Sequence, residues 1–78
     1  MAFGVVSSNY DYSKLRGKIV EKFGSFRSFG EAMNMGYTSL SFRLNNKAEW
    51  SQEEMKKAME LLGEDSSSVT EYFFAHRL

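Results

Sequence analysis

Residues 37–45 carry the side chains of this chain that are best suited to recognising another molecule. If the segment is helical, Leu40 and Leu44 lie one turn apart and face the protein interior. The outward and flanking positions are then Tyr37, Thr38, Ser41, Phe42 and Asn45. Hydroxyl and amide groups form hydrogen bonds, and aromatic rings make apolar contacts. This combination predicts a binding surface rather than a site that breaks covalent bonds.

Catalytic and metal-binding chemistry is not expected from the rest of the chain. There is no cysteine, and a single histidine is too few for a metal cluster or a histidine-based catalytic group. Glu53 and Glu54 are adjacent on a predicted helix, so their carboxylates diverge and do not form an acid–base pair. We therefore expect no enzyme activity, no metal site and no cofactor.

Size and charge favour a small binding module. A chain of 78 residues is expected to fold as one domain with a small core. Residues 12–47 contain seven basic and two acidic residues, whereas residues 48–78 contain three basic and seven acidic residues. This asymmetry indicates a polyanionic partner for one face, although small proteins also segregate charge by chance. No apolar run is long enough to span a membrane, which predicts a cytoplasmic protein without a membrane partner.

The spacing of the apolar residues predicts an all-α fold, a compact bundle of four to five short helices that contains a helix-turn-helix. A first helix is expected to begin near Asp11 and to end at Gly24. Two short helices follow at residues 26–33 and 37–45. The start of a fourth helix is marked by a capping box, in which Ser51 is followed three residues later by Glu54. Gly63 is expected to end that helix.

Three parts of the chain are expected to differ in character. Residues 1–10 lack periodicity and predict a flexible N-terminal arm. Residues 11–63 form the helical domain. Residues 64–78 begin with an acidic, serine-rich loop and end with an aromatic segment. Because exposed aromatic residues are unfavourable in a flexible tail, this segment is expected to pack on the domain, with a dimer contact as the alternative.

The two short helices have the spacing of a helix-turn-helix. Gly30 is a small residue at the point where the next helix must cross closely. Asn34, four residues later, tolerates the left-handed backbone of a tight turn. Leu40, six residues further on, is placed to enter the core. Each feature is weak alone, but together they favour this motif.

Six short segments carry a family resemblance: Asp11-Tyr12-Ser13-Lys14-Leu15-Arg16-Gly17, Phe23-Gly24, Ser39-Leu40-Ser41, Leu44-Asn45-Asn46-Lys47, Glu60-Leu61-Leu62-Gly63 and Tyr72-Phe73-Phe74. With them, the chain resembles small phage repressors of the Cro/CI or Xre helix-turn-helix family. The resemblance implies a phage- or prophage-encoded transcriptional regulator of a bacterial host cell. It also implies sequence-specific binding to double-stranded DNA, commonly as a homodimer on an inverted-repeat operator.

In such a motif, the second helix lies in the major groove and reads base edges. The resemblance therefore assigns base reading in helix 37–45 to Tyr37, Thr38, Ser41, Phe42 and Asn45. An asparagine amide suits adenine, and a phenyl ring suits a thymine methyl group. Phosphate contacts set register without reading sequence. They are assigned to residues near helix ends, namely Ser25, Arg27, Arg43, Asn46 and Lys47.

A protein-binding module on the same scaffold is the alternative, for example an antirepressor or an inhibitor of a host factor. Tyr37, Phe42 and Phe26 would then be interface anchors, because aromatic residues often dominate the binding energy of protein interfaces. An exposed apolar patch of this kind needs a partner to cover it.

Overall fold

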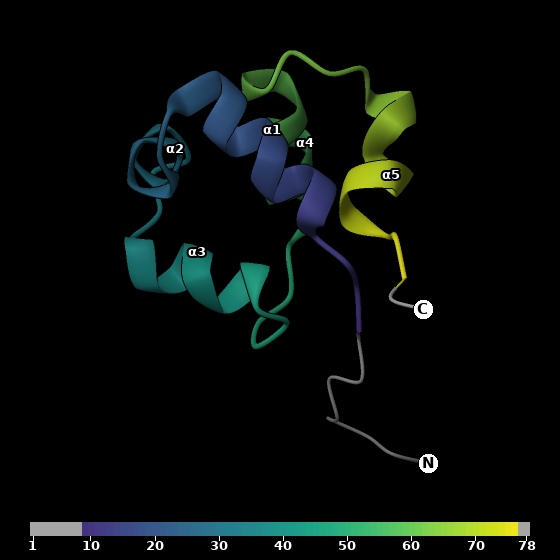
Figure 1. Ribbon diagram of the computed structural model, residues 1–78, viewed down its shortest axis with the longest axis horizontal. Helices are drawn as coiled ribbons and strands as arrows, with labels where there is room; N and C mark the ends of the chain where they lie inside the picture. Colours follow the sequence, from purple (N-terminus) through teal and green to yellow (C-terminus); the bar gives the residue numbers. More distant parts are fainter. Residues whose placement is uncertain (1–8, 77–78) are drawn as a thin grey trace.

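The computed structural model describes residues 9–76, which form five α-helices (Figure 1). Their bounds are α1 Ser13–Phe23, α2 Phe26–Ala32, α3 Tyr37–Leu44, α4 Gln52–Leu61 and α5 Val69–Phe73, with a 3-10 turn, η1 Ser66–Ser68, before α5. Residues 9–76 include no strand, only an isolated antiparallel bridge between Tyr10 and His76. The expected all-α fold is confirmed. Residues 1–8, most of the expected arm, lie outside the described residues.

Helix α1 is central, with α2 at one of its ends and α5 beside the other (Figure 1). Every helix or its end contributes to one core, whose largest fully buried side chains are Phe29, Phe73, Leu15, Ile19, Leu40 and Leu62. An ion pair between Lys14 and Glu71 also fastens α1 to α5. Within residues 9–76, no helix has the length and apolar character needed to cross a bilayer.

Left-handed residues end four of the helices where the sequence predicts them. Gly24, with a φ of 80°, ends α1, and the other three helix ends share one hydrogen-bond pattern. The φ angles are 59° at Asn34, 61° at Asn46 and 71° at Gly63. The amide that follows each of these residues donates back to the carbonyl oxygen of the helix, at 2.7–2.9 Å. This arrangement is a Schellman motif, which satisfies carbonyl groups that a helix end would otherwise leave unpaired. Only residues 33–36 are therefore needed to connect α2 to α3.

Gly30 sets how closely α3 can approach α2. A Cβ atom at this position would lie 3.0 Å from the carbonyl oxygen of Met35 and 3.7 Å from Cδ2 of Leu40. Leu40 is itself fully buried. The absence of a side chain at Gly30 thus lets Leu40 seat α3 on the core, as the spacing of these residues predicts.

The predicted helix starts differ in how well they match the structure. Ser51 and Glu54 form the expected capping box of α4, with the Ser51 side chain accepting from the Glu54 amide at 3.0 Å. Helix α1 begins at Ser13, two residues after Asp11, and Tyr12 occupies the N-cap position. The Asp11 carboxylate nevertheless accepts from the Ser13 amide at 2.9 Å, so it satisfies the first amide of the helix.

Candidate recognition surface on helix α3

Helix α3 presents two aromatic side chains to solvent. Tyr37 is 52% exposed and Phe42 is 49% exposed, while Leu40 and Leu44 on the opposite side are buried. Thr38 is exposed and Ser41 is half-buried. We call the five predicted base-reading positions of this helix and its C-cap the α3 surface: Tyr37, Thr38, Ser41, Phe42 and Asn45. The structure brings all five together on one side of α3.

The amide group of Asn45 is occupied within the protein. Its oxygen accepts from Nη2 of Arg16 at 3.0 Å. Its nitrogen donates to the backbone oxygen of Ser41 at 2.9 Å and to the Ser41 hydroxyl at 3.3 Å. Arg16 also donates to the backbone oxygen of Leu44 at 3.0 Å. Asn45 and Arg16 therefore close the C-terminal end of α3, and the predicted base contact of Asn45 would require these bonds to break.

Arg43 connects α3 to the start of α4. Its Nε and Nη2 atoms donate to the two carboxylate oxygens of Glu54 at 3.0 and 3.1 Å, and Nη1 donates to the backbone oxygen of Ser39 at 3.0 Å. Burial would raise the pKa of Glu54, but the hydrogen bonds from Arg43 and from the Ser51 amide outweigh it and lower that pKa below its ordinary value. All three guanidinium nitrogens thus have partners inside the protein.

Asn46 holds the segment that precedes α1. Its side-chain oxygen accepts from the Tyr10 amide at 3.3 Å, and its side-chain nitrogen donates to the Tyr10 backbone oxygen at 3.0 Å. The sequence predicts a phosphate contact here, but both ends of the amide are already used. Asparagine suits this position for two reasons: it tolerates the left-handed backbone, and its amide group can bond both backbone groups of Tyr10.

The remaining predicted phosphate contacts are more accessible. Ser25 caps α2 by accepting from the Ser28 amide at 3.1 Å. Arg27 is exposed, and its guanidinium lies 5.7 Å from the centre of the Tyr37 ring. Lys47 is exposed just after α3. Arg27 and Lys47 are therefore the two charged members of the predicted set that have no ion pair among residues 9–76.

A hollow of about 130 Å³ lies beside the α3 surface. It is lined by Arg16, Phe26, Tyr37, Leu40, Ser41, Leu44 and Asn45. The Arg16 guanidinium covers the Phe26 ring at 5.8 Å, an arrangement that favours both groups. The contacts of Arg16 with α3 and Phe26 were not predicted from the sequence, in which Arg16 is one of several basic residues on α1. No short-range pattern connects it with Asn45, 29 positions later.

Comparison with known proteins places the chain in a phage context. Residues 8–76 match the model of a family described as "Protein of unknown function (DUF739)". No curated protein matches the chain. Among solved structures, it is similar to the solution structure of the modulator of repression (MOR) of the temperate bacteriophage TP901-1 from Lactococcus lactis. That similarity has a TM-score of 0.76 and 40% sequence identity, and it covers 87% of this chain and 92% of the other.

Proposed function

The chain belongs to the DUF739 family, and from this premise we propose that it is a phage regulatory protein that acts by binding another protein through the α3 surface. The partner that we propose is the repressor of the same phage. The name of the TP901-1 protein, modulator of repression, supports this role, since it describes an action on repression. The 40% identity between the two chains supports a related task.

One observation carries the proposal: the outward groups of α3 that are not engaged within the protein are mainly aromatic. Tyr37 and Phe42 are about half exposed. The polar side chain of Asn45 is occupied by Arg16 and Ser41, and Arg43 is occupied by Glu54. Aromatic side chains in a surface with few available charges are typical of protein–protein hot spots.

The direct test is calorimetry of the purified chain with the purified repressor of its phage. Because aromatic hot spots contribute about 2 kcal/mol or more, Tyr37→Ala and Phe42→Ala should each weaken binding by at least about tenfold. Val20→Ala is the matched control, since Val20 is 47% exposed but lies on α1. Unchanged affinity in both aromatic variants would show that the α3 surface is not the interface.

Sequence-specific DNA binding is a second candidate, and the joint between α2 and α3 favours it. The close approach at Gly30 and the left-handed turn at Asn34 are the mechanical features of a helix-turn-helix. In this interpretation, a homodimer would place α3 of each copy in the major groove of an inverted repeat, and Arg27 and Lys47 would contact phosphates.

Selection from a random duplex pool distinguishes the two candidates. If the chain reads DNA, an inverted repeat should be enriched, and affinity for it should fall steeply as salt rises. Arg27→Gln and Lys47→Gln should each reduce the salt slope by about one, because each removes one phosphate contact. Failure to enrich any site, together with tight binding to the repressor, would leave the protein-binding role alone.

A further inference from the structure

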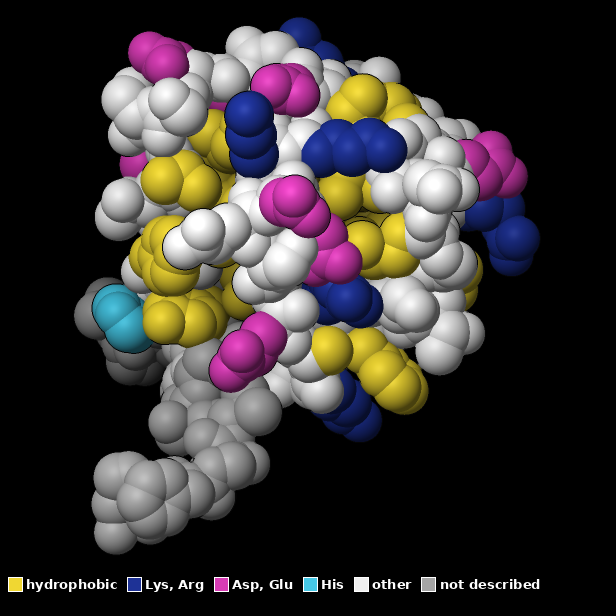
Figure 2. Space-filling view, turned by 180° about the vertical axis from the view of Figure 1, so that it is seen from behind, with side chains coloured by type: hydrophobic (Ala, Val, Ile, Leu, Met, Phe, Trp, Pro, Cys, Tyr) yellow, Lys and Arg dark blue, Asp and Glu magenta, His cyan; other side chains and the backbone are white. Residues whose placement is uncertain are grey.

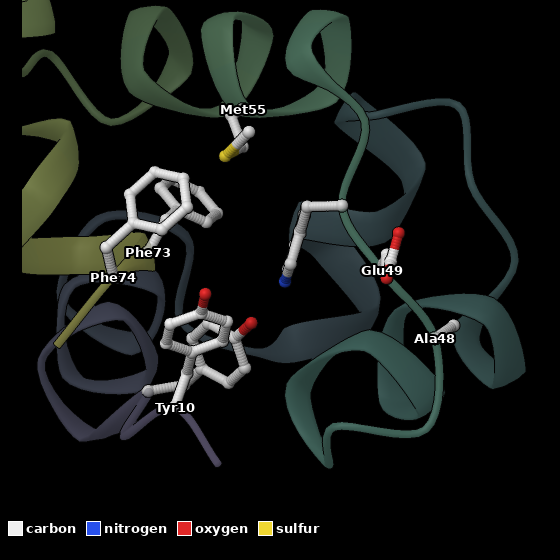
Figure 3. A pocket seen from close by; sticks show the side chains of 8 residues that line it. Tyr10, Ala48, Glu49, Met55, Phe73 and Phe74 are labelled. Carbon is white, nitrogen blue, oxygen red and sulfur yellow. The ribbon is translucent and has the colours of Figure 1, made fainter. Parts of the chain in front are cut away.

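A second hollow lies away from the α3 surface, where the segment before α1 meets the start of α4 and the end of α5. Its volume is about 260 Å³. We call it the aromatic cavity, and it is lined by Tyr10, Tyr12, Ala48, Glu49, Trp50, Met55, Phe73 and Phe74. Figure 3 shows the side chains of Tyr10, Met55, Phe73 and Phe74 converging on one space, with Glu49 on the side across from Phe74.

Five aromatic rings form a continuous chain around this space. The ring centres of Phe74 and Tyr10 are 5.7 Å apart, and those of Tyr10 and Tyr12 are 6.2 Å apart. The chain continues from Tyr12 to Trp50 at 6.5 Å and from Trp50 to Phe73 at 5.0 Å. The interplanar angles of these pairs lie between 50° and 87°, so none of the pairs is stacked face to face. The five rings therefore contact one another in tilted or edge-to-face arrangements, and all five line the cavity.

The cavity is built before any ligand arrives. Asn46 fixes both backbone groups of Tyr10, and the Asp11 amide donates to the Ala75 backbone oxygen at 2.7 Å. Three of the rings are core residues: Tyr12, Trp50 and Phe73 are only 6%, 9% and 2% exposed. Phe74, at 39%, remains open to solvent at the rim. Figure 2 shows hydrophobic side chains gathered beside the single histidine, which pairs with Tyr10 in this region. A preformed site loses little entropy when it binds.

Charge and size define what would fit. Among the lining residues, Glu49 is the only charged one, and it is exposed. Residues 48–78, which supply six of the eight lining residues, carry seven acidic and three basic residues. Ring faces attract cations, and a carboxylate at the rim adds to that attraction. The volume is smaller than that of common small-molecule sites, which measure about 300–1,000 Å³, so it suits a single side chain.

We propose that the aromatic cavity binds the lysine or arginine side chain of a partner protein, with the ring faces around the cation and Glu49 beside it. This site is independent of the α3 surface, so its test does not depend on the proposed function. The described part of the chain does not supply the cation itself, because no lysine or arginine among residues 9–76 lines the cavity.

The experiment is a titration of the full chain with blocked amino acids, followed by two-dimensional NMR. The readout is the indole N–H signal of Trp50, the single tryptophan, whose side chain is buried and lines the cavity. Nα-acetyl-lysine and Nα-acetyl-arginine methylamides should shift this signal saturably. The neutral norleucine compound, which has a similar apolar stem, should bind at least about fivefold more weakly, because it lacks the cation–π attraction.

Variants locate the binding in the cavity. Phe74→Ala and Glu49→Gln should each weaken lysine binding about threefold or more, and neither residue is buried. Val20→Ala and Glu53→Gln are the matched controls on exposed positions outside the cavity, and they should leave it unchanged. Asn46→Gly keeps the left-handed turn but removes the clamp on Tyr10, so it should also weaken binding.

Three outcomes would overturn the proposal. Equal binding of the norleucine and lysine compounds would show an apolar cavity without cation selectivity. Binding of tetramethylammonium without binding of either blocked amino acid would indicate a small free cation instead of a side chain. Binding of blocked lysine only after Arg77→Gln would identify the chain's own Arg77, which lies outside the described residues, as the occupant.

Discussion

Aromatic side chains are used in opposite ways in two regions of this protein. On the α3 surface, Tyr37 and Phe42 are 52% and 49% exposed, whereas Trp50 and Phe73 at the aromatic cavity are 9% and 2% exposed. The inner face of α3 is already filled by leucines, so its aromatic residues add nothing to the core. Three rings of the cavity, those of Tyr12, Trp50 and Phe73, belong to that core. Folding and recognition should therefore be separable on α3 and coupled at the cavity.

The largest expected effect tests this separation directly. Phe73→Ala should lower the free energy of unfolding by about 3–5 kcal/mol, because it removes a buried ring and leaves a void. Phe42→Ala should change it by no more than about 0.5 kcal/mol, since that side chain is half exposed. Urea denaturation followed by circular dichroism measures both. A large loss of stability in Phe42→Ala would mean that α3 depends on its aromatic residues for folding, and the comparison would fail.

A smaller effect is expected where α3 is seated on α2. Gly30→Ala would place a Cβ atom 3.0 Å from the backbone oxygen of Met35, and backbone gives way less easily than a side chain. We expect a loss of about 1–3 kcal/mol in unfolding free energy. Gly17→Ala is the control of opposite sign: nothing lies within 4 Å of the added atom, and alanine should stabilise the interior of α1 by about 0.5–1 kcal/mol.

Partner binding sharpens the same comparison. If Gly30→Ala shifts α3, it should weaken repressor binding through the α3 surface and leave lysine binding at the aromatic cavity unchanged.

Thermal denaturation gives the stability of the two glycine variants, Gly30→Ala and Gly17→Ala. Equal stability of both variants would show that α3 does not need the close approach at Gly30.

The sequence predicts the local features of this fold well. Asn34, Asn46 and Gly63 take the left-handed backbone that their residue types favour, and Leu40 and Leu44 are the buried residues of α3. These features depend on residues a few positions apart, where spacing alone carries the information. For the same reason, the capping box at Ser51 is found from the sequence.

The contacts of the polar side chains are not predictable in this way. Asn45, Arg43 and Asn46 reach partners that lie 29, 11 and 36 positions away in the sequence. Those contacts form only after the helices pack. From the sequence, the three polar side chains are therefore expected to be available to a partner. In the structure, their hydrogen-bonding groups are already bonded within the protein. The aromatic cavity was missed because its rings come from three separate parts of the chain.

The smallest expected effect concerns the link between α3 and α4, and it depends on pH. Arg43 and the Ser51 amide lower the pKa of Glu54 in the folded protein, against the opposing effect of burial. A carboxyl whose pKa is lower when folded stabilises the protein above its unfolded pKa, near 4.5, and that stabilisation is lost as pH falls through the folded value. An ion pair that is partly exposed contributes about 0.5 kcal/mol.

Glu54→Gln should isolate this contribution, because glutamine at the third helical position still serves a capping box. The variant should be less stable than the wild type by about 0.5 kcal/mol near pH 6, and the difference should shrink as pH falls below about 4.5 and through the lowered pKa of the folded protein. Glu53→Gln, one residue earlier and exposed, makes no ion pair among residues 9–76 and is the control. Urea denaturation at a series of pH values measures the three proteins. A difference that stays constant with pH would mean that Arg43 stabilises α3 through Ser39 instead of through the charge on Glu54.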